Sequence, residues 1–218
     1  RVLNESETFL GGRGLPQSLK NIRREAMATL TDIEKKELAK VLNQKPALPS
    51  LPDLTGRKLV KQWQSPDFAG TLNFTPKQRN LANGKKMFHV ALCSRCHRHG
   101  REGYPIGPDL THVASRFGRG DLLGEILDPS KSIAENYQTT ILDLKDGRKL
   151  AGQIIPNLDY RLPNLQLAEN PLHPDKITQV PKVKIAKQYR SNVSLMPPGL
   201  LNLLTKDEVL DLLAWLRT

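Results

Sequence analysis

The chain has 218 residues and a formal net charge of +11 at pH 7, a length suited to one or two compact domains and a charge that favours acidic partners. Its basic residues are spread along the chain without a dense run or binding motif, which argues against nucleic acid as the partner, and no apolar run approaches the length of a membrane span. Hydrophobic residues make up 38% of the chain and aromatic residues only 5%, so a bound apolar group would help to fill a core of this size.

The first predicted elements are two helices. Apolar residues recur at steps of three and four along residues 18–43, which predicts helices at 18–30 and 32–43. Thr31 and Glu34 have the spacing of a capping box, in which the threonine caps the second helix and the glutamate reaches back to it.

Residues 1–45 are therefore expected to form a helical extension, either packed on the main domain or the end of a helical repeat. The start at Arg1, without a leader, is expected of a processed chain or a fragment. Residues 46–74 are rich in proline, which predicts a linker or strap. Within this range, residues 54–68 have the pattern of a short helix. Trp63 is expected to anchor the core, with a lid over a bound group as the alternative.

A further helix is predicted to begin at Thr75 and Pro76, because proline is favoured at the first helical position, and to run directly into Cys93. Gly84 on this helix would let another helix approach closely. The residues expected on its buried face are Leu81, Gly84, Met87, Phe88 and Ala91.

The next stretch is Cys93-Ser94-Arg95-Cys96-His97, which contains both cysteines of the chain. Two cysteines separated by two residues and followed by histidine are typical of c-type haem attachment. Each thiol adds across a haem vinyl group to form a thioether, and His97 then supplies a nitrogen to the iron. A redox dithiol would leave His97 without a role, and a zinc site would need a second pair of ligands.

A glycine-rich loop follows at residues 98–109. A histidine that ligates a metal donates its other N–H to a carbonyl or carboxylate, and the backbone carbonyl of Pro108 is the expected acceptor, with an ordinary turn as the alternative. Short helices are predicted at 110–117 and 121–127. Arg116 is a candidate to contact a haem propionate, and a solvated surface charge is an equal alternative.

The pattern then becomes alternating, which is typical of strands. Asp146 and Gly147 lie between two apolar runs and predict a hairpin turn. A second β-like region covers 165–167 and 177–185 and is split by prolines. We therefore expect a small β insertion at about 137–190.

Met196 lies in a proline-flanked loop before a final predicted helix at 206–216 and is the expected sixth ligand of the iron. Met27 lies far upstream, and Met87 is expected in the core. Ligation by methionine and histidine raises the reduction potential and closes the iron to substrates, which suits electron transfer. The alternatives are a histidine, His112 or His173, and an open sixth position.

The order of these motifs resembles that of class I cytochromes c, and more closely the planctomycete-type haem-binding domain (Pirellula/Verrucomicrobium type). The resemblance covers about 75–218. The motifs that carry it are Gly107-Pro108-Asp109-Leu110-Thr111, Ala114-Ser115-Arg116-Phe117, Ile126-Leu127-Asp128-Pro129-Ser130, Tyr137-Gln138-Thr139, Asp146-Gly147, Ser194-Leu195-Met196-Pro197-Pro198-Gly199-Leu200 and Asp211-Leu212-Leu213-Ala214-Trp215-Leu216.

The resemblance implies a mainly α, class I cytochrome c fold with a small β insertion and an N-terminal helical extension. It implies one haem c bound by thioethers at Cys93 and Cys96, with His97 and Met196 as axial ligands. Such domains often follow a dehydrogenase region and helical repeats in large exported proteins. That would make residues 1–45 the end of the repeats, although this chain has no dehydrogenase portion.

The expected function is therefore an electron carrier rather than an enzyme. The expected partner has an acidic docking surface and is an exported dehydrogenase, fused or separate. Because bacteria attach haem c outside the cytoplasm, a periplasmic or otherwise exported location is expected. The alternatives are a haem enzyme or a gas or redox sensor with a labile sixth ligand, and an interaction module in which the helical extension and the β insertion bind partners.

Overall fold

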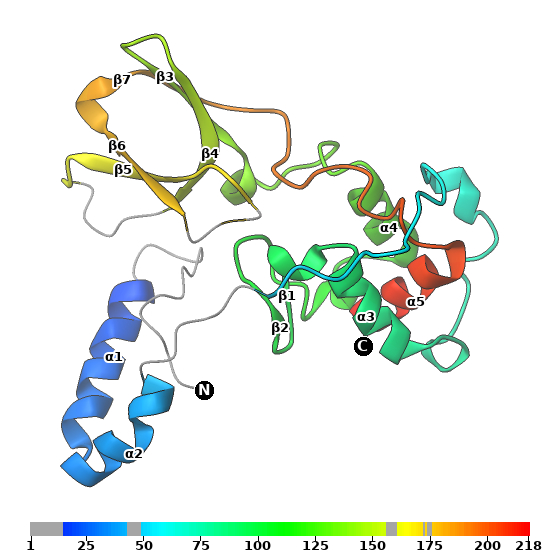
Figure 1. Cartoon of the computed structure of the whole chain (residues 1–218), viewed down its shortest axis with the longest axis horizontal. Helices are drawn as coiled ribbons and strands as arrows, with labels where there is room; N and C mark the ends of the chain where they lie inside the picture. Colours follow the sequence, from blue (N-terminus) through cyan, green and yellow to red (C-terminus); the bar gives the residue numbers. More distant parts are fainter. Residues whose placement is uncertain (1–14, 43–48, 156–160, 172, 174–175) are drawn as a thin grey trace.

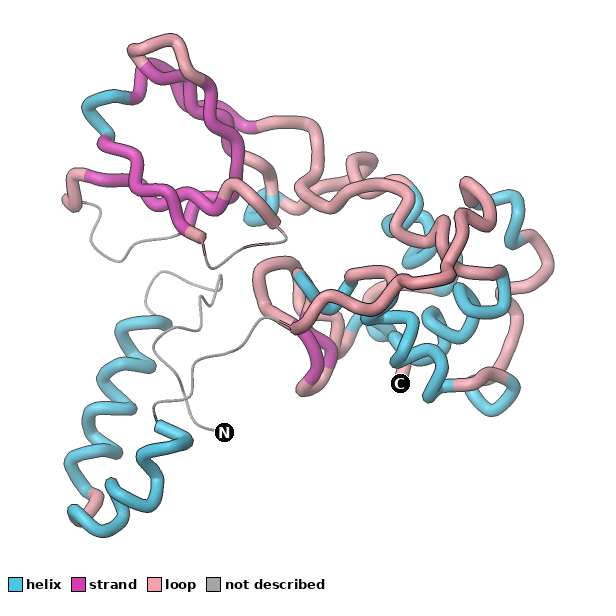
Figure 2. Tube along the Cα trace, in the orientation of Figure 1, coloured by secondary structure: helices cyan, strands magenta, loops and turns pink. Residues whose placement is uncertain are grey.

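The computed structural model describes residues 15–42, 49–155, 161–171, 173 and 176–218. Within these residues it contains five α-helices, a five-stranded antiparallel sheet and a separate two-stranded hairpin (Figures 1 and 2). The expected mainly α class is therefore wrong, and the fold is mixed α/β. No helix in the described part combines the length and the apolar character that crossing a bilayer requires.

The N-terminal part contains α1 (Leu15–Thr29) and α2 (Asp32–Leu42), which lie side by side (Figure 1) and confirm the two predicted helices. The backbone N–H of Thr31 donates to Oε2 of Glu34 over 2.8 Å, and the N–H of Glu34 donates to the Thr31 hydroxyl over 3.3 Å. This reciprocal pair is the predicted capping box.

Residues 49–64 contain no helix or strand, so the helix predicted at 54–68 is wrong except for a short 3₁₀-turn, η1 (Ser65–Phe68). Contacts with the loop before the last helix hold this segment. The indole N–H of Trp63 donates to the carbonyl oxygen of Leu204 over 3.0 Å. The Trp63 ring packs against the apolar core, which confirms its predicted role as a core anchor.

The core of the helical part lies where α3 (Leu81–Val90) crosses α5 (Lys206–Leu216) (Figure 1). A Cβ atom at Gly84 would lie 2.7 Å from Cβ of Trp215, so only glycine allows this close approach. Met87 on α3 has no exposed surface, which confirms its predicted place in the core.

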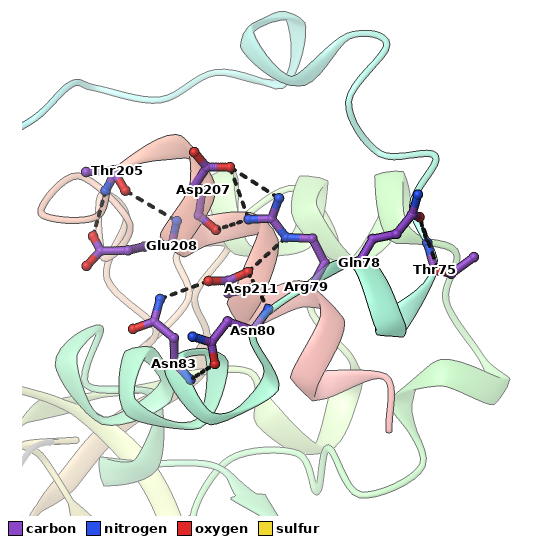
Figure 3. Close-up of polar contacts among 9 residues, drawn as sticks. All are labelled: Thr75, Gln78, Arg79, Asn80, Asn83, Thr205, Asp207, Glu208 and Asp211. Atoms are coloured by element: carbon purple, nitrogen blue, oxygen red, sulfur yellow. Dashed lines mark hydrogen bonds and ion pairs between the residues drawn. The ribbon is translucent and has the colours of Figure 1, made fainter.

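Asp211 on α5 joins that helix to the start of α3 (Figure 3). Its carboxylate, which is buried, accepts hydrogen bonds from Nε of Arg79 (2.8 Å), the backbone N–H of Asn80 (3.1 Å) and the side-chain amide of Asn83 (2.9 Å). Because Asn80 is the N-cap, α3 begins after it, and the predicted start lies instead in a separate 3₁₀-turn, η2 (Pro76–Gln78).

Two further predictions concern the short helices after the cysteine motif. The helix predicted at 121–127 is confirmed as α4 (Arg119–Leu127), which buries Leu122 and Leu123 in the core. The helix predicted at 110–117 is only a 3₁₀-turn, η4 (Val113–Ser115).

The five-stranded sheet curls into an open roll (Figures 1 and 2), and we call residues 140–190 the rolled sheet. The predicted turn at Asp146 and Gly147 is confirmed, and Gly147 has the positive φ of 86° that such turns require. The spatial order is β6-β5-β4-β3-β7, so the first strand along the chain pairs with the last. The strands are β3 (Thr140–Leu144), β4 (Lys149–Ile155), β5 (Asn164–Ala168), β6 (Ile177–Pro181) and β7 (Ile185–Arg190).

The described prolines of this region, Pro163, Pro171 and Pro181, lie at or near strand ends and do not prevent the strands. Pro181 ends β6 at the edge of the sheet, opposite Asn164, where a missing N–H is tolerated. A 3₁₀-turn, η6 (Lys182–Lys184), then leads into β7. The chain leaves and re-enters the helical part at one place, because the backbone N–H of Ser191 donates to the carbonyl oxygen of Thr139 over 2.8 Å. The interior of the roll is apolar and contains Leu142, Leu144, Leu167 and Val180.

Candidate cofactor site

The cysteine motif lies in a tight turn at the end of α3. The helix does not run into Cys93 as predicted, because Leu92 has a left-handed backbone with φ of 61°. Among the described residues it is the sole non-glycine residue with positive φ. Such strain costs about 1–3 kcal/mol and is found where function requires it. A 3₁₀-turn, η3 (Cys93–Arg95), follows, and the N–H of His97 donates to the carbonyl oxygen of Cys93 over 2.8 Å.

The loop after the motif folds back under it through a two-residue hairpin, β1 (Arg98–His99) and β2 (Glu102–Gly103). The backbone N–H of Gly107 donates to the carbonyl oxygen of Cys96 over 2.7 Å. A Cβ at Gly107 would lie 2.8 Å from Cε1 of His97, so glycine is needed for the imidazole ring to lie here.

The orientation of His97 is fixed by one hydrogen bond. Its Nδ1 lies 2.8 Å from the backbone carbonyl oxygen of Pro108. A carbonyl oxygen only accepts, so the proton lies on Nδ1 and the lone pair of the neutral ring lies on Nε2. Burial lowers the pKa of His97, although the bond to Pro108 partly opposes this effect. The ring is therefore neutral at pH 7 and suited to bind a metal through Nε2.

Both cysteines are free thiols in the structure, and Cys93 is buried. Burial raises the pKa of Cys93 to about 12 and that of Cys96 to about 11. Reactive dithiols have lowered thiol pKa values, so these surroundings argue against the redox-dithiol alternative. In the described part of the chain, no three His, Cys, Asp or Glu side chains cluster to hold a metal, and a structural zinc site needs four ligands.

The motif opens into two adjoining cavities. The Cys96-side cavity has about 830 Å³ of space between its lining atoms, and the Arg116-side cavity has about 1300 Å³, with the open solvent at each mouth included. The residues that line both cavities are Cys93, His97, Pro108, Tyr137, Ser194 and Met196.

Met196 reaches these cavities from the loop before α5. Its side chain is partly buried against the apolar core, and its backbone N–H donates to the Ser194 hydroxyl over 3.1 Å. The side chain lines the same two cavities as His97. The other candidate ligands, His112 and His173, are exposed and line neither cavity.

Arg116 lines the Arg116-side cavity with an exposed side chain. One nitrogen of its guanidinium donates to the carbonyl oxygen of Asp109 over 3.3 Å. The residue therefore lies at the opening of the cavity, with its charged side chain exposed to solvent.

Three further cavity residues were not identified from the sequence. Tyr137 is half-buried between the two cavities, and burial raises its pKa. Gln153 and Pro171 belong to the rolled sheet and its loops and line the Cys96-side cavity. Gln153 lies in an apolar strand. The alternation of side chains along the strand shows that Gln153 shares a face with Ile155, but it does not show what that face contacts.

A comparison with known families gives one match, to the family model for Cytochrome c over residues 81–149. The matched range contains α3, the cysteine motif, α4, β3 and the turn that follows β3, and it ends at the first residue of β4. It covers about a third of the chain and gives no support to the planctomycete-type subgroup. The chain matches no curated protein.

Proposed function

We propose that this chain, which carries a cytochrome c domain at residues 81–149, is a single-haem electron carrier. The family match indicates haem binding and electron transfer, and the finer assignments are ours. Cys93 and Cys96 hold haem c through thioether bonds, and His97 and Met196 are the axial ligands. Bound haem c supplies a one-electron redox couple.

The observation that carries this proposal is the hydrogen bond between Nδ1 of His97 and Pro108, which leaves Nε2 with its lone pair. Met196 shares both cavities with this imidazole. The two thiols beside it are uncharged, and Cys93 is buried while Cys96 is partly buried. Together these groups offer two attachment points and two ligands of different chemistry around one apolar space.

We further propose how the chain is divided into regions around this site. Residues 1–45 are a helical extension, 46–74 a strap, and 75–218 one cytochrome domain that includes the rolled sheet. The protein works in the periplasm or another exported compartment and accepts electrons from a dehydrogenase, fused or separate. The net charge of +11 suits a partner with an acidic docking surface.

The test is the optical spectrum of protein matured with haem c, in the oxidised and reduced states. We expect a low-spin ferric spectrum with the weak far-red band of sulfur ligation, lost in Met196→Ala. His112→Ala is the matched control and should leave the spectrum unchanged. A high-spin wild-type protein would favour the enzyme or sensor alternative, and a spectrum unaffected by Met196→Ala would exclude methionine as the ligand.

A further inference from the structure

The rolled sheet contacts the cysteine motif through a small apolar cluster of its own. Ile155 on β4 and Ala168 on β5 are buried against Ile106 in the loop after the motif. Cys96 packs against the same cluster, and its sulfur lies 3.3 Å from the carbonyl oxygen of Pro171. The sheet is therefore held directly beside the second thiol of the motif.

Gln153 lies on the face of β4 that makes this contact. It precedes Ile155 by two residues, so both side chains point to the same side of the strand. Ile154, between them, packs into the interior of the roll instead. Gln153 thus points out of the roll, toward the motif.

The Gln153 amide is almost completely buried, with 4% of the residue exposed, yet it lines the Cys96-side cavity together with His97 and Met196. Its Nε2 donates to the carbonyl oxygen of Asn136 over 3.5 Å, a long hydrogen bond. The amide therefore borders the same space as His97 and Met196, and a group bound there would be part of its surroundings.

We infer that the rolled sheet is one wall of the haem pocket and that Gln153 contacts the haem and helps to set its reduction potential. This inference rests on the proposed haem site. The ferric state has one more positive charge than the ferrous state, so water at the haem stabilises the ferric state, and a wall that excludes water favours the ferrous state.

The first experiment measures how near Gln153 lies to the iron. Haem-loaded protein labelled with ¹⁵N-glutamine is compared by NMR in its ferric and ferrous states. The Gln153 amide signals are assigned by their loss in Gln153→Leu. Gln188 is an internal control, because it is exposed on β7 of the same sheet and does not line either cavity. We expect the Gln153 signals to shift or broaden strongly on oxidation and those of Gln188 to change little.

The second experiment tests the effect on potential with Gln153→Ala and Gln188→Ala. Truncation at Gln153 should admit water, so that the ferric-to-ferrous ratio at a fixed applied potential rises at least threefold, or about 28 mV for a one-electron couple. Gln188→Ala should leave the ratio unchanged. The inference is overturned if the oxidation shifts of Gln153 are no larger than those of Gln188, or if the two alanine variants have the same potential.

The proposed haem site and the role of Gln153 can be rejected separately. Covalent haem is detected by staining of the denatured protein, and its ligation is reported by the Met196→Ala spectrum. Absence of covalent haem removes the proposed function, whereas a spectrum unaffected by Met196→Ala removes only Met196 as the ligand. A protein that passes both tests but shows no effect at Gln153 retains its function, and only the role of the rolled sheet is rejected.

Discussion

Arg57 in the strap and Glu208 on α5 form a two-pronged ion pair, with nitrogen–oxygen distances of 2.8 and 3.1 Å. The same guanidinium donates to the carbonyl oxygen of Leu203 over 3.1 Å, and its Nη2 lies 3.6 Å from the sulfur of Met87. A segment without regular structure is thereby tied to both helices that form the core.

This pair predicts an acid-sensitive contribution to stability. The hydrogen bond from Arg57, the largest effect, lowers the pKa of Glu208. A carboxylate with a lowered pKa stabilises the fold above its unfolded pKa of about 4.3 and loses this contribution as the pH falls through its folded pKa. Glu208→Gln should therefore cost about 1–2 kcal/mol at pH 7 and much less at pH 3. Urea unfolding at both pH values measures this difference.

Glu37→Gln is the control for that experiment, because Glu37 is exposed on α2. It should change the free energy of unfolding by less than about 0.5 kcal/mol at either pH. An equal loss at pH 7 and pH 3 for Glu208→Gln would contradict the ion-pair explanation.

The buried carboxylate of Asp211 predicts a larger loss. Asp211→Asn keeps the shape of the side chain but removes the charge opposite Arg79 and one of the two oxygens that accept hydrogen bonds from three donors. We expect a loss of about 2–4 kcal/mol in the free energy of unfolding. Asp207→Asn is the matched control, since the Asp207 side chain is 85% exposed although it also contacts Arg79, and it should cost less than about 1 kcal/mol. Denaturant midpoints decide between the two, and similar losses would show that burial is not the cause.

The contact between Gly107 and His97 predicts a loss of correct ligation. In Gly107→Ala the new methyl group would lie 2.8 Å from Cε1 of the imidazole, so the ring must move away from Pro108. We expect less attached haem and a high-spin fraction in the ferric spectrum. Gly124→Ala on α4 is the control, because a Cβ at Gly124 would have no neighbour within 4 Å and should leave the spectrum unchanged. A low-spin spectrum with full haem content in Gly107→Ala would disprove the crowding argument.

The positive charge predicts how electron transfer responds to salt. With an acidic redox protein as donor, the second-order rate should fall at least about tenfold between 10 mM and 300 mM ionic strength, because ions screen the attraction. An uncharged small-molecule reductant measures the intrinsic reactivity and should show little dependence on salt. A rate with the acidic donor that is independent of ionic strength would count against an acidic docking partner.

Elements with local signals were predictable from the sequence. The last helix begins after Thr205, whose hydroxyl accepts from Glu208 N–H over 3.3 Å while the Glu208 carboxylate accepts from Thr205 N–H over 2.9 Å. Both residues lie within one turn, so their spacing alone defines the cap. The turn at Asp146 and Gly147 is equally local, because glycine supplies the positive φ.

The helix within the strap was predicted wrongly because the conformation of this segment depends on residues that lie far away in the sequence. The strap has helical periodicity, but the backbone N–H of Val60 donates to the carbonyl oxygen of Asn202 over 2.8 Å and holds the segment in a conformation without helix. The sheet is a different case, because its strands lie within the β insertion predicted at about 137–190. Only their pairing was not predicted, since Thr140 pairs with Arg190, fifty positions later, and no local pattern reports such a pairing.

The candidate site divides in the same way. Cys93, Cys96 and His97 stand together in the sequence and were identified there. Met196 lies far along the chain, and only its flanking prolines and the resemblance pointed to it. Gln153 was missed because its strand gave no indication of what its outer face contacts, and that contact is created by the way the sheet packs on the motif loop.

The pairing of Thr139 with Ser191 makes the rolled sheet a side branch of the helical domain. The two ends of the rolled sheet are joined by one hydrogen bond, so the helices on either side of it are connected as if by a short turn. The long separation of His97 from Met196 in the sequence therefore adds little to the entropic cost of closing the chain around the site. This position is therefore a place in the fold where one inserted module could be exchanged for another. Exchanging the module attached there would give the proposed haem site a different wall while Cys93, Cys96, His97 and Met196 stayed in place.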